Sequence, residues 1–223
     1  MRRGERVPVW VGAGRAPGWP KEVCGGLNGG TGGAAGGGTA AGAEVVGASR
    51  GYGRACAAGV AAVAPETEIV VFLDGDGSDC PEFMAQLVAP IVADTHDFII
   101  GSRTRGRREP GSMNFPQVAS GYLAGLILRL LYGVRYTDMS PFRAIRPETL
   151  RALGMREQTY GWNLEMQMRA ARAGLRILEV PVNHRCRTGG ESKVSGTLRG
   201  TVVTGARILA TLFRVAAEHK PSL

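Results

Sequence analysis

Apolar and polar positions recur along the chain with the periods of strands and helices from about residue 44 onward. Five consecutive apolar residues, mostly β-branched or aromatic, predict a buried central strand over 68–73. Around it, strand patterns alternate with helix patterns, which favours an α/β fold with a mostly parallel sheet flanked by helices. The predicted strands cover residues 44–46, 68–73, 97–101, 137–145 and 175–182. The predicted helices cover residues 52–64, 117–132, 162–173 and 197–217, and further helices begin at Pro81 and Pro147.

Residues 1–43 differ from the rest, so we divide the chain into an atypical glycine-rich segment (1–43) and one domain (44–223). A short strand is predicted at 7–11, but residues 25–42 are mainly glycine, alanine and threonine. Such a stretch buries too little apolar surface to offset its ordering entropy. We therefore expect the N-terminal strands of the sheet to be incomplete or poorly ordered.

The composition is that of one globular domain with a basic surface. The 223 residues are 44% hydrophobic, which is enough for one substantial core, and the formal net charge is +8. Positive charge favours an anionic partner: a nucleotide, a lipid phosphate, an anionic membrane face or a nucleic acid. The plainer alternative is a solvated surface rich in arginine. We do not expect a nucleic-acid partner, because aromatic residues are not interleaved with the basic ones.

The cysteines and the apolar segments of the sequence indicate the expected cellular location of the protein. The four cysteines are scattered without metal-ligand spacing, so we expect reduced thiols in a cytoplasmic protein. The N-terminus has no sustained apolar run, so a signal peptide is not expected. Arginines interrupt the most apolar helical stretches, 121–131 and 201–215. These stretches can lie on the inner face of a membrane, but we do not expect them to cross it.

Two aspartates, Asp74 and Asp76, follow the central strand directly, with glycines between and after them. Glycine ends the strand in a turn, and α/β sheets bind ligands at such carboxyl ends of strands. Two hard oxygen donors close together suit Mg²⁺ or Mn²⁺, which in turn suit a phosphate ester. The plainer interpretation is a surface turn or an Asx cap. Asp79 is expected to cap the helix that begins near Pro81.

Arginines near the ends of several predicted strands are candidates for phosphate contact, because their guanidinium forks match phosphate oxygens. The candidates are Arg103, with Arg107 or Arg108; one of Arg143 and Arg146; and Arg185, Arg187 and Lys193 in a loop that contains two glycines. A solvated loop is the alternative for each group.

Glu165 lies near the start of the helix predicted at 162–173. Three roles fit such a carboxylate: a general base, a partner for an arginine, or a favourable charge in the first helical turn. The histidines at positions 96 and 184 are isolated in the sequence, and each is expected to be a surface or packing residue.

Several short motifs, in the order in which they occur, resemble those of the family 2 glycosyltransferases. The resemblance is to the branch that includes dolichyl-phosphate mannosyltransferase and polyprenyl-phosphate glucosyltransferases. The resemblance spans about residue 43 to the end and implies a GT-A fold, a nucleoside-diphosphate sugar donor and inversion at the anomeric carbon. The matching words are Arg50-Gly51-Tyr52-Gly53, Leu73-Asp74-Gly75-Asp76, Ile100-Gly101-Ser102-Arg103, Phe142-Arg143-Ala144-Ile145-Arg146, Gly161-Trp162-Asn163-Leu164-Glu165, Glu179-Val180-Pro181-Val182 and Gly190-Glu191-Ser192-Lys193.

The resemblance implies a role for each matching residue. Asp74 would face the nucleotide and Asp76 the metal on the diphosphate, while Glu165 stands where relatives with hydroxyl acceptors place the base. A phosphate acceptor has a second pKa of about 6 and needs no base, in which case Glu165 would orient an arginine or the sugar. The remaining implied donor-site and phosphate-site residues are Gly51, Tyr52, Gly53, Arg103, Arg143, Arg185 and Lys193.

The N-terminal segment departs from the family pattern, since neither of the two words that hold the base and ribose in relatives is intact. At one of them, Gly32 stands where an aspartate is expected. The resemblance nevertheless predicts an enzyme, a hexosyltransferase that moves a sugar from a nucleoside-diphosphate sugar to a polyprenyl or dolichyl phosphate with Mg²⁺ or Mn²⁺. The alternatives are a catalytically silent protein of the same fold and a basic nucleic-acid binder.

Overall fold

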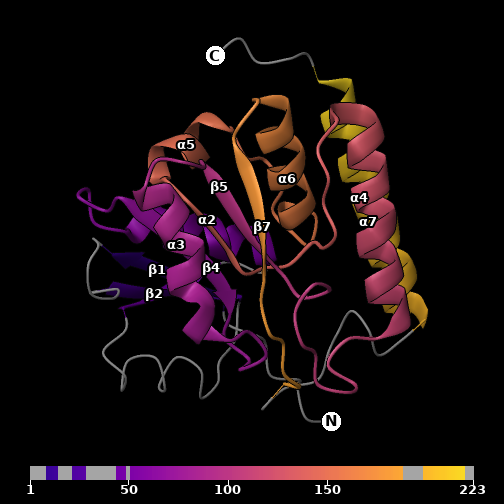
Figure 1. Ribbon diagram of the computed structural model, residues 1–223, viewed down its shortest axis with the longest axis horizontal. Coiled ribbons are helices and arrows are strands. Elements are labelled where there is room, and N and C mark those ends of the chain that lie inside the picture. Colours follow the sequence, from indigo (N-terminus) through magenta and orange to yellow (C-terminus); the bar gives the residue numbers. More distant parts are fainter. Residues whose placement is uncertain (1–8, 15–21, 29–43, 49–50, 188–197, 219–223) are drawn as a thin grey trace.

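The computed structural model describes residues 9–14, 22–28, 44–48, 51–187 and 198–218. A central sheet separates helices on its two faces, and α4, α6 and α7 gather on one side of the molecule (Figure 1). The helices are α2 (Tyr52–Ala62), α3 (Met84–Val92), α4 (Phe115–Tyr132), α5 (Pro147–Ala152), α6 (Trp162–Arg172) and α7 (Leu198–Ala217), with a short 3₁₀ helix, η1 (Pro81–Phe83).

The sheet has seven strands in the order β3-β2-β1-β4-β6-β5-β7. From their pairings, β1 and β6 run against the other five. The predicted α/β fold is confirmed; the sheet is mixed, with five of its seven strands in one direction and four of its six neighbouring pairs antiparallel. The N-terminal segment, where we expected incomplete strands, contributes β1 and β2 to this sheet, and the residues around these strands lie outside the described ranges. The strands are β1 (Val9–Gly14), β2 (Glu22–Asn28), β3 (Glu44–Ala48), β4 (Ile69–Asp74), β5 (Phe98–Ser102), β6 (Arg143–Ile145) and β7 (Ile177–Pro181).

The core lies on both faces of the sheet because side chains alternate along each strand. Val70 and Phe72 of β4 join the larger cluster, which includes residues of α2, α4, α6 and α7. Ile69 and Val71 of the same strand face the other way and pack with residues of α3. Burial on both faces explains why the central strand is apolar without alternation.

Helix α4 buries three small residues and Leu128, and exposes most of its other large apolar residues. Gly125 packs so closely that an added Cβ would lie 1.9 Å from the carbonyl oxygen of Tyr136. Small inward residues permit this approach, and most of the large apolar residues in the helix predicted over 117–132 therefore face outward. The exposed large residues of this helix are Phe115, Tyr122, Leu123, Leu126, Leu130 and Leu131.

Candidate active site

The turn after β4 folds around the carboxylate of Asp76. Its Oδ1 accepts hydrogen bonds from the backbone N–H of Ser78 (2.9 Å) and from the Ser78 hydroxyl (2.5 Å). Gly77 has φ of 80°, a left-handed conformation that glycine adopts without strain. These two contacts close an Asx-type turn that fixes the orientation of the buried Asp76 side chain, whose second oxygen, Oδ2, takes no part in the turn.

Asp74 and Asp79 meet beside this turn. Asp79 Oδ2 accepts a hydrogen bond from the backbone N–H of Asp74 (2.8 Å), and the Asp79 side chain makes no cap at the start of η1. The predicted cap is therefore wrong: the carboxylate holds the end of β4 instead. Burial, followed by repulsion from Asp79 and then Asp76, raises the pKa of Asp74 to about 8, against the opposing charges of Arg103 and Arg187.

The segment after β7 closes over these carboxylates. His184 is buried, its backbone pairs with Asp79 and Arg108, and its Nδ1 lies 3.7 Å from Asp79 Oδ1. Arg187 extends from the same segment, and its Nε lies 3.0 Å from Asp76 Oδ2. His184, expected as a surface or packing residue, packs at the centre of this junction.

A divalent cation fits this group of carboxylates. Asp74 Oδ1 and Asp79 Oδ1 are buried without a hydrogen-bond partner, so these two oxygens have unsatisfied acceptor capacity. Within the described residues, no three or more His, Cys, Asp or Glu side chains form a ready-made metal cluster. Mg²⁺ in phosphate-transfer sites is typically held by one or two carboxylates plus substrate phosphates. The turn therefore suits an ion whose coordination is completed by a diphosphate.

Arg103 lies near the site, but its fork is occupied by a carboxylate. Its Nε and Nη2 each lie 2.8 Å from an oxygen of Asp138, and its backbone N–H donates to the same carboxylate (2.9 Å). Although burial opposes it, this pairing keeps the pKa of Asp138 below its usual value. Arg103 acts on Asp74 through its charge, which lowers the pKa of that carboxyl.

Arg143 lies in the core and not beside the aspartates. Its guanidinium donates to the carbonyl oxygens of Ser140 and Asn163, and it lies 5.8 Å from the centre of the Phe98 ring. The side chain is fully buried, and this burial lowers its pKa. Because β6 places alternate residues on opposite faces, Arg143 enters the larger core cluster instead of reaching the end of the sheet.

Glu165 is fully buried, and both of its oxygens are engaged. Oε2 accepts from the backbone N–H groups of Arg156 (2.9 Å) and Glu157 (2.6 Å). Oε1 accepts from Arg169 Nε and Arg214 Nη1, each at 3.0 Å. Among the three roles considered from the sequence, this geometry fits a partner for arginine, one that ties α7 to α6.

The glycines at the start of α2 serve close packing. Gly53 N–H donates to the carbonyl of Thr159 (3.3 Å), and an added Cβ at Gly53 would lie 2.3 Å from the carbonyl oxygen of Glu157. Gly51 is equally close to the oxygen of Gln158. Tyr52 lies between these two glycines. Burial raises the pKa of its hydroxyl, and the nearby charge of Asp74 raises it further. The sequence motifs did not indicate that the start of α2 packs against the loop at residues 157–159.

Two candidates remain from the C-terminal loop. Arg185 is exposed and pairs with Glu82, so it faces η1 and not the aspartates. Lys193 lies outside the described residues. Arg187 was a candidate for phosphate contact together with Arg185 and Lys193, and its guanidinium contacts the Asp76 carboxylate.

Comparison with known proteins finds relatives of this chain among the glycosyltransferases. The family model described as "Glycosyl transferase family 2" matches residues 45–154. An uncharacterised glycosyltransferase of Mycobacterium tuberculosis (strain ATCC 25618 / H37Rv) is 38% identical over 172 residues, which cover 73% of this chain and 72% of the relative. The undecaprenyl-phosphate mannosyltransferase of Micrococcus luteus is 36% identical over 144 residues, 61% of this chain and 57% of the relative.

Solved structures share the fold. Glucosyl-3-phosphoglycerate synthase from Mycobacterium tuberculosis, in complex with Mn²⁺, uridine diphosphate and glucosyl-3-phosphoglycerate, matches with a TM-score of 0.63. The match has 22% identity and covers 86% of this chain and 67% of that chain. The fold is thus that of the GT-A glycosyltransferases, as the sequence words implied. Taken with the relatives, this shows that the chain belongs to glycosyltransferase family 2.

Proposed function

We propose that this chain is an inverting hexosyltransferase that moves a sugar from a nucleoside-diphosphate sugar to a polyprenyl-type or dolichyl-type phosphate. The observation that carries the proposal is the turn after β4, where three aspartates, Asp74 and the buried Asp76 and Asp79, gather at the end of the central strand. The similarity to an undecaprenyl-phosphate mannosyltransferase supports the acceptor class.

In this proposal Asp76 and Asp74 would hold Mg²⁺ or Mn²⁺ beside the diphosphate of the donor. When bound, the metal would act as a Lewis acid toward the charge that develops on the departing diphosphate. An oxygen of the acceptor phosphate forms a bond to the anomeric carbon as the bond to the diphosphate oxygen breaks. The configuration at that carbon is inverted, and the nucleoside diphosphate leaves with the electron pair of the broken bond.

The state of Glu165 supports a phosphate acceptor over a hydroxyl acceptor. A hydroxyl acceptor needs a base within hydrogen-bond reach, whereas a phosphate monoester is already anionic near neutral pH, its second pKa being about 6. Both oxygens of Glu165 accept hydrogen bonds from arginines and backbone N–H groups. This carboxylate therefore positions α6 and α7 in our account and removes no proton.

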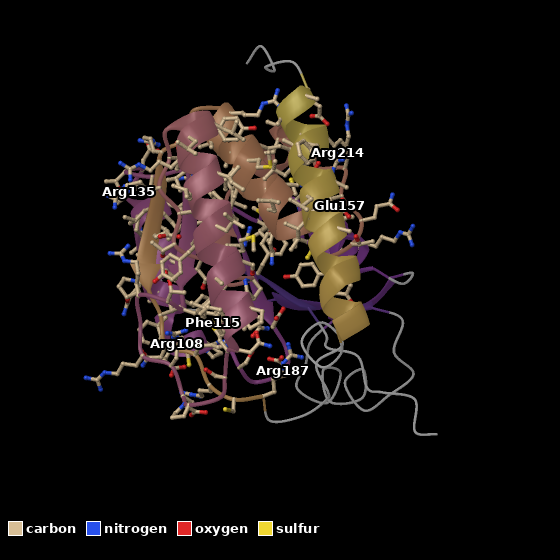
Figure 2. The ribbon with its side chains drawn as sticks, turned by 90° about the vertical axis from the view of Figure 1, so that its right-hand side faces the viewer. Arg108, Phe115, Arg135, Glu157, Arg187 and Arg214 are labelled. Atoms are coloured by element: carbon tan, nitrogen blue, oxygen red, sulfur yellow. The ribbon has the colours of Figure 1, made fainter. Side chains whose placement is uncertain are left out.

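An outward apolar face supports a lipid-linked acceptor. Phe115 and Leu130 of α4 are 84% and 78% exposed, and Phe213 of α7 is 68% exposed. Figure 2 shows α4 and α7 on the same side of the molecule, with Phe115 and Arg108 at the end where Arg187 lies. Exposed apolar side chains rimmed by arginine are typical of surfaces that rest in the headgroup region of a bilayer. No helix among the described residues is long and apolar enough to cross a membrane.

A donor and acceptor panel tests this function. The purified chain is incubated with Mn²⁺, each of several nucleoside-diphosphate hexoses, and either polyprenyl phosphate in vesicles or a polyprenol lacking the phosphate. We expect transfer to the phosphate and none to the alcohol. Transfer to the alcohol alone would refute the acceptor assignment. Absence of both donor binding and transfer would favour a catalytically silent protein of this fold.

A further inference from the structure

The cation that faces Asp76 is supplied by the chain itself. Asp76 Oδ1 is occupied by the N–H and hydroxyl of Ser78, which leaves Oδ2 as the oxygen that can take a cation. Arg187 Nε lies 3.0 Å from this Oδ2. The Asp76 side chain is 2% exposed, while that of Arg187 is 33% exposed, so the carboxylate is buried and the arginine paired with it has access to solvent.

A metal ion and this guanidinium compete for the same oxygen. A divalent ion bound at Oδ2 would stand against the positive charge of Arg187 at close range, and such repulsion in a partly buried site is only weakly screened. Metal binding at Asp76 therefore requires Arg187 to withdraw. Since the arginine side chain is partly exposed and its charge is never lost by deprotonation, it withdraws by changing position.

We propose that Arg187 is an internal counterion that suppresses binding of a divalent metal alone and makes metal and diphosphate bind together. The proposal rests on the assignment of Asp76 as a metal ligand in the proposed function. When a diphosphate arrives with the metal, its oxygens offer the guanidinium a new anionic partner with matching fork geometry. The arginine then leaves Asp76 to the metal and binds the diphosphate. The site consequently fills with the metal–nucleotide pair in preference to free metal.

The neighbouring arginine provides a matched control. Arg185 lies two residues earlier in the same segment and is also exposed, but it pairs with Glu82 of η1. Removing its charge changes the net charge of the protein as much as removing that of Arg187 does. It leaves the counterion of Asp76 in place, so any effect confined to Arg187 reports on that contact.

Manganese binding measured by electron paramagnetic resonance tests the proposal, because the sharp signal of free Mn²⁺ falls as the ion binds. Affinities are measured for the full chain without nucleotide and with saturating uridine diphosphate or guanosine diphosphate. For Arg187→Gln we expect Mn²⁺ alone to bind about three- to tenfold more tightly than to the wild type. The enhancement by nucleotide should shrink by a similar factor. Arg187→Lys, which keeps the charge, and Arg185→Gln should both stay within about twofold of the wild type.

Two results would overturn the proposal, and they differ in what else they overturn. If the wild type binds Mn²⁺ with nucleotide but Arg187→Gln and Arg187→Met leave both affinities unchanged, the counterion role is wrong and the metal site stands. If neither wild type nor variants bind Mn²⁺ with or without nucleotide, the metal assignment of Asp76 fails, and the counterion role fails with it. Circular dichroism melts confirm that each variant is folded before titration.

Discussion

Replacing Glu165 by glutamine separates an architectural carboxylate from a catalytic base. The carboxylate has no exposed surface and joins two arginines, Arg169 and Arg214, of which only Arg214 is substantially exposed, at 36%. Removing one charge from a buried ion pair typically costs about 3–5 kcal/mol. Because glutamine keeps one acceptor oxygen and Arg214 is partly screened by solvent, we expect a loss of about 2–3 kcal/mol.

Thermal unfolding and transfer kinetics together measure this effect. A loss of about 2–3 kcal/mol corresponds to a decrease in Tm of roughly 5–10 °C for a domain of this size. The matched control is Glu148→Gln, whose side chain is exposed at the start of α5 and whose Tm should change by about 1 °C or less. Well below the Tm, kcat of Glu165→Gln should stay within a few-fold of the wild type. An unchanged Tm with a decrease in kcat of about a hundredfold, the loss expected for a general base, would refute the reasoning.

Three further predictions concern the strand-end carboxylates, the start of α2 and the apolar face. The folded-state pKa of Asp74, about 8, exceeds the ordinary value of 3.8, so its contribution favours folding below about pH 4 and is lost as the pH rises through 8. Asp74→Asn should therefore raise the metal-free Tm at pH 8 more than at pH 5, and a larger gain at pH 5 would contradict this. Gly53→Ala places a Cβ 2.3 Å from a backbone oxygen and should cost about 2–4 kcal/mol in urea unfolding, whereas Gly121→Ala, with 3.6 Å of clearance, should be neutral or stabilising. Leu130→Asn should weaken sedimentation with anionic vesicles several-fold while Val92→Asn on α3 should not, and equal losses would remove the argument for the α4 face.

The sequence predicted the fold because the central strand and its turn carry local signals. Apolar residues over 69–73 required burial on both faces, and the glycines around Asp76 required a turn at the end of the strand. Both features appear in the structure. The α/β fold followed from the alternation of strand and helix, although periodicity could not show that β6 runs antiparallel to its neighbours.

The arginines show what sequence reasoning could not reach. Arg103 directly follows β5, Arg143 begins β6 and Arg187 lies in the segment after β7, and all three were candidates for phosphate contact. Only tertiary contacts distinguish them. Arg103 is paired with Asp138, Arg143 is fully buried in the core, and Arg187 is paired with Asp76. Nothing in the residue order indicates which guanidinium already has a partner, because, apart from the local Ser140 carbonyl that Arg143 also uses, those partners are 20 or more residues away.

The exposed face of α4 marks a second limit of pattern reasoning. A stripe of leucines at helical spacing indicates an apolar face, but it does not say which side of the helix meets the protein. Gly121, Ala124 and Gly125 decide this, since their small size lets the helix approach the segment before β6 and turns every leucine of the helix except Leu128 outward. Leucines that would normally indicate a core are therefore exposed here.

The measurement that tests the central claim most directly is donor binding to Asp76→Asn. Asparagine retains the oxygen that accepts from Ser78, so the turn should keep its shape while the charge on the other oxygen is lost. Calorimetric titration of nucleoside-diphosphate hexoses with Mn²⁺ should show binding to the wild type and to Asp94→Asn, an exposed control at the end of α3. Binding to Asp76→Asn should fall at least about tenfold and lose its dependence on Mn²⁺. Undiminished, Mn²⁺-dependent binding to Asp76→Asn would contradict the account.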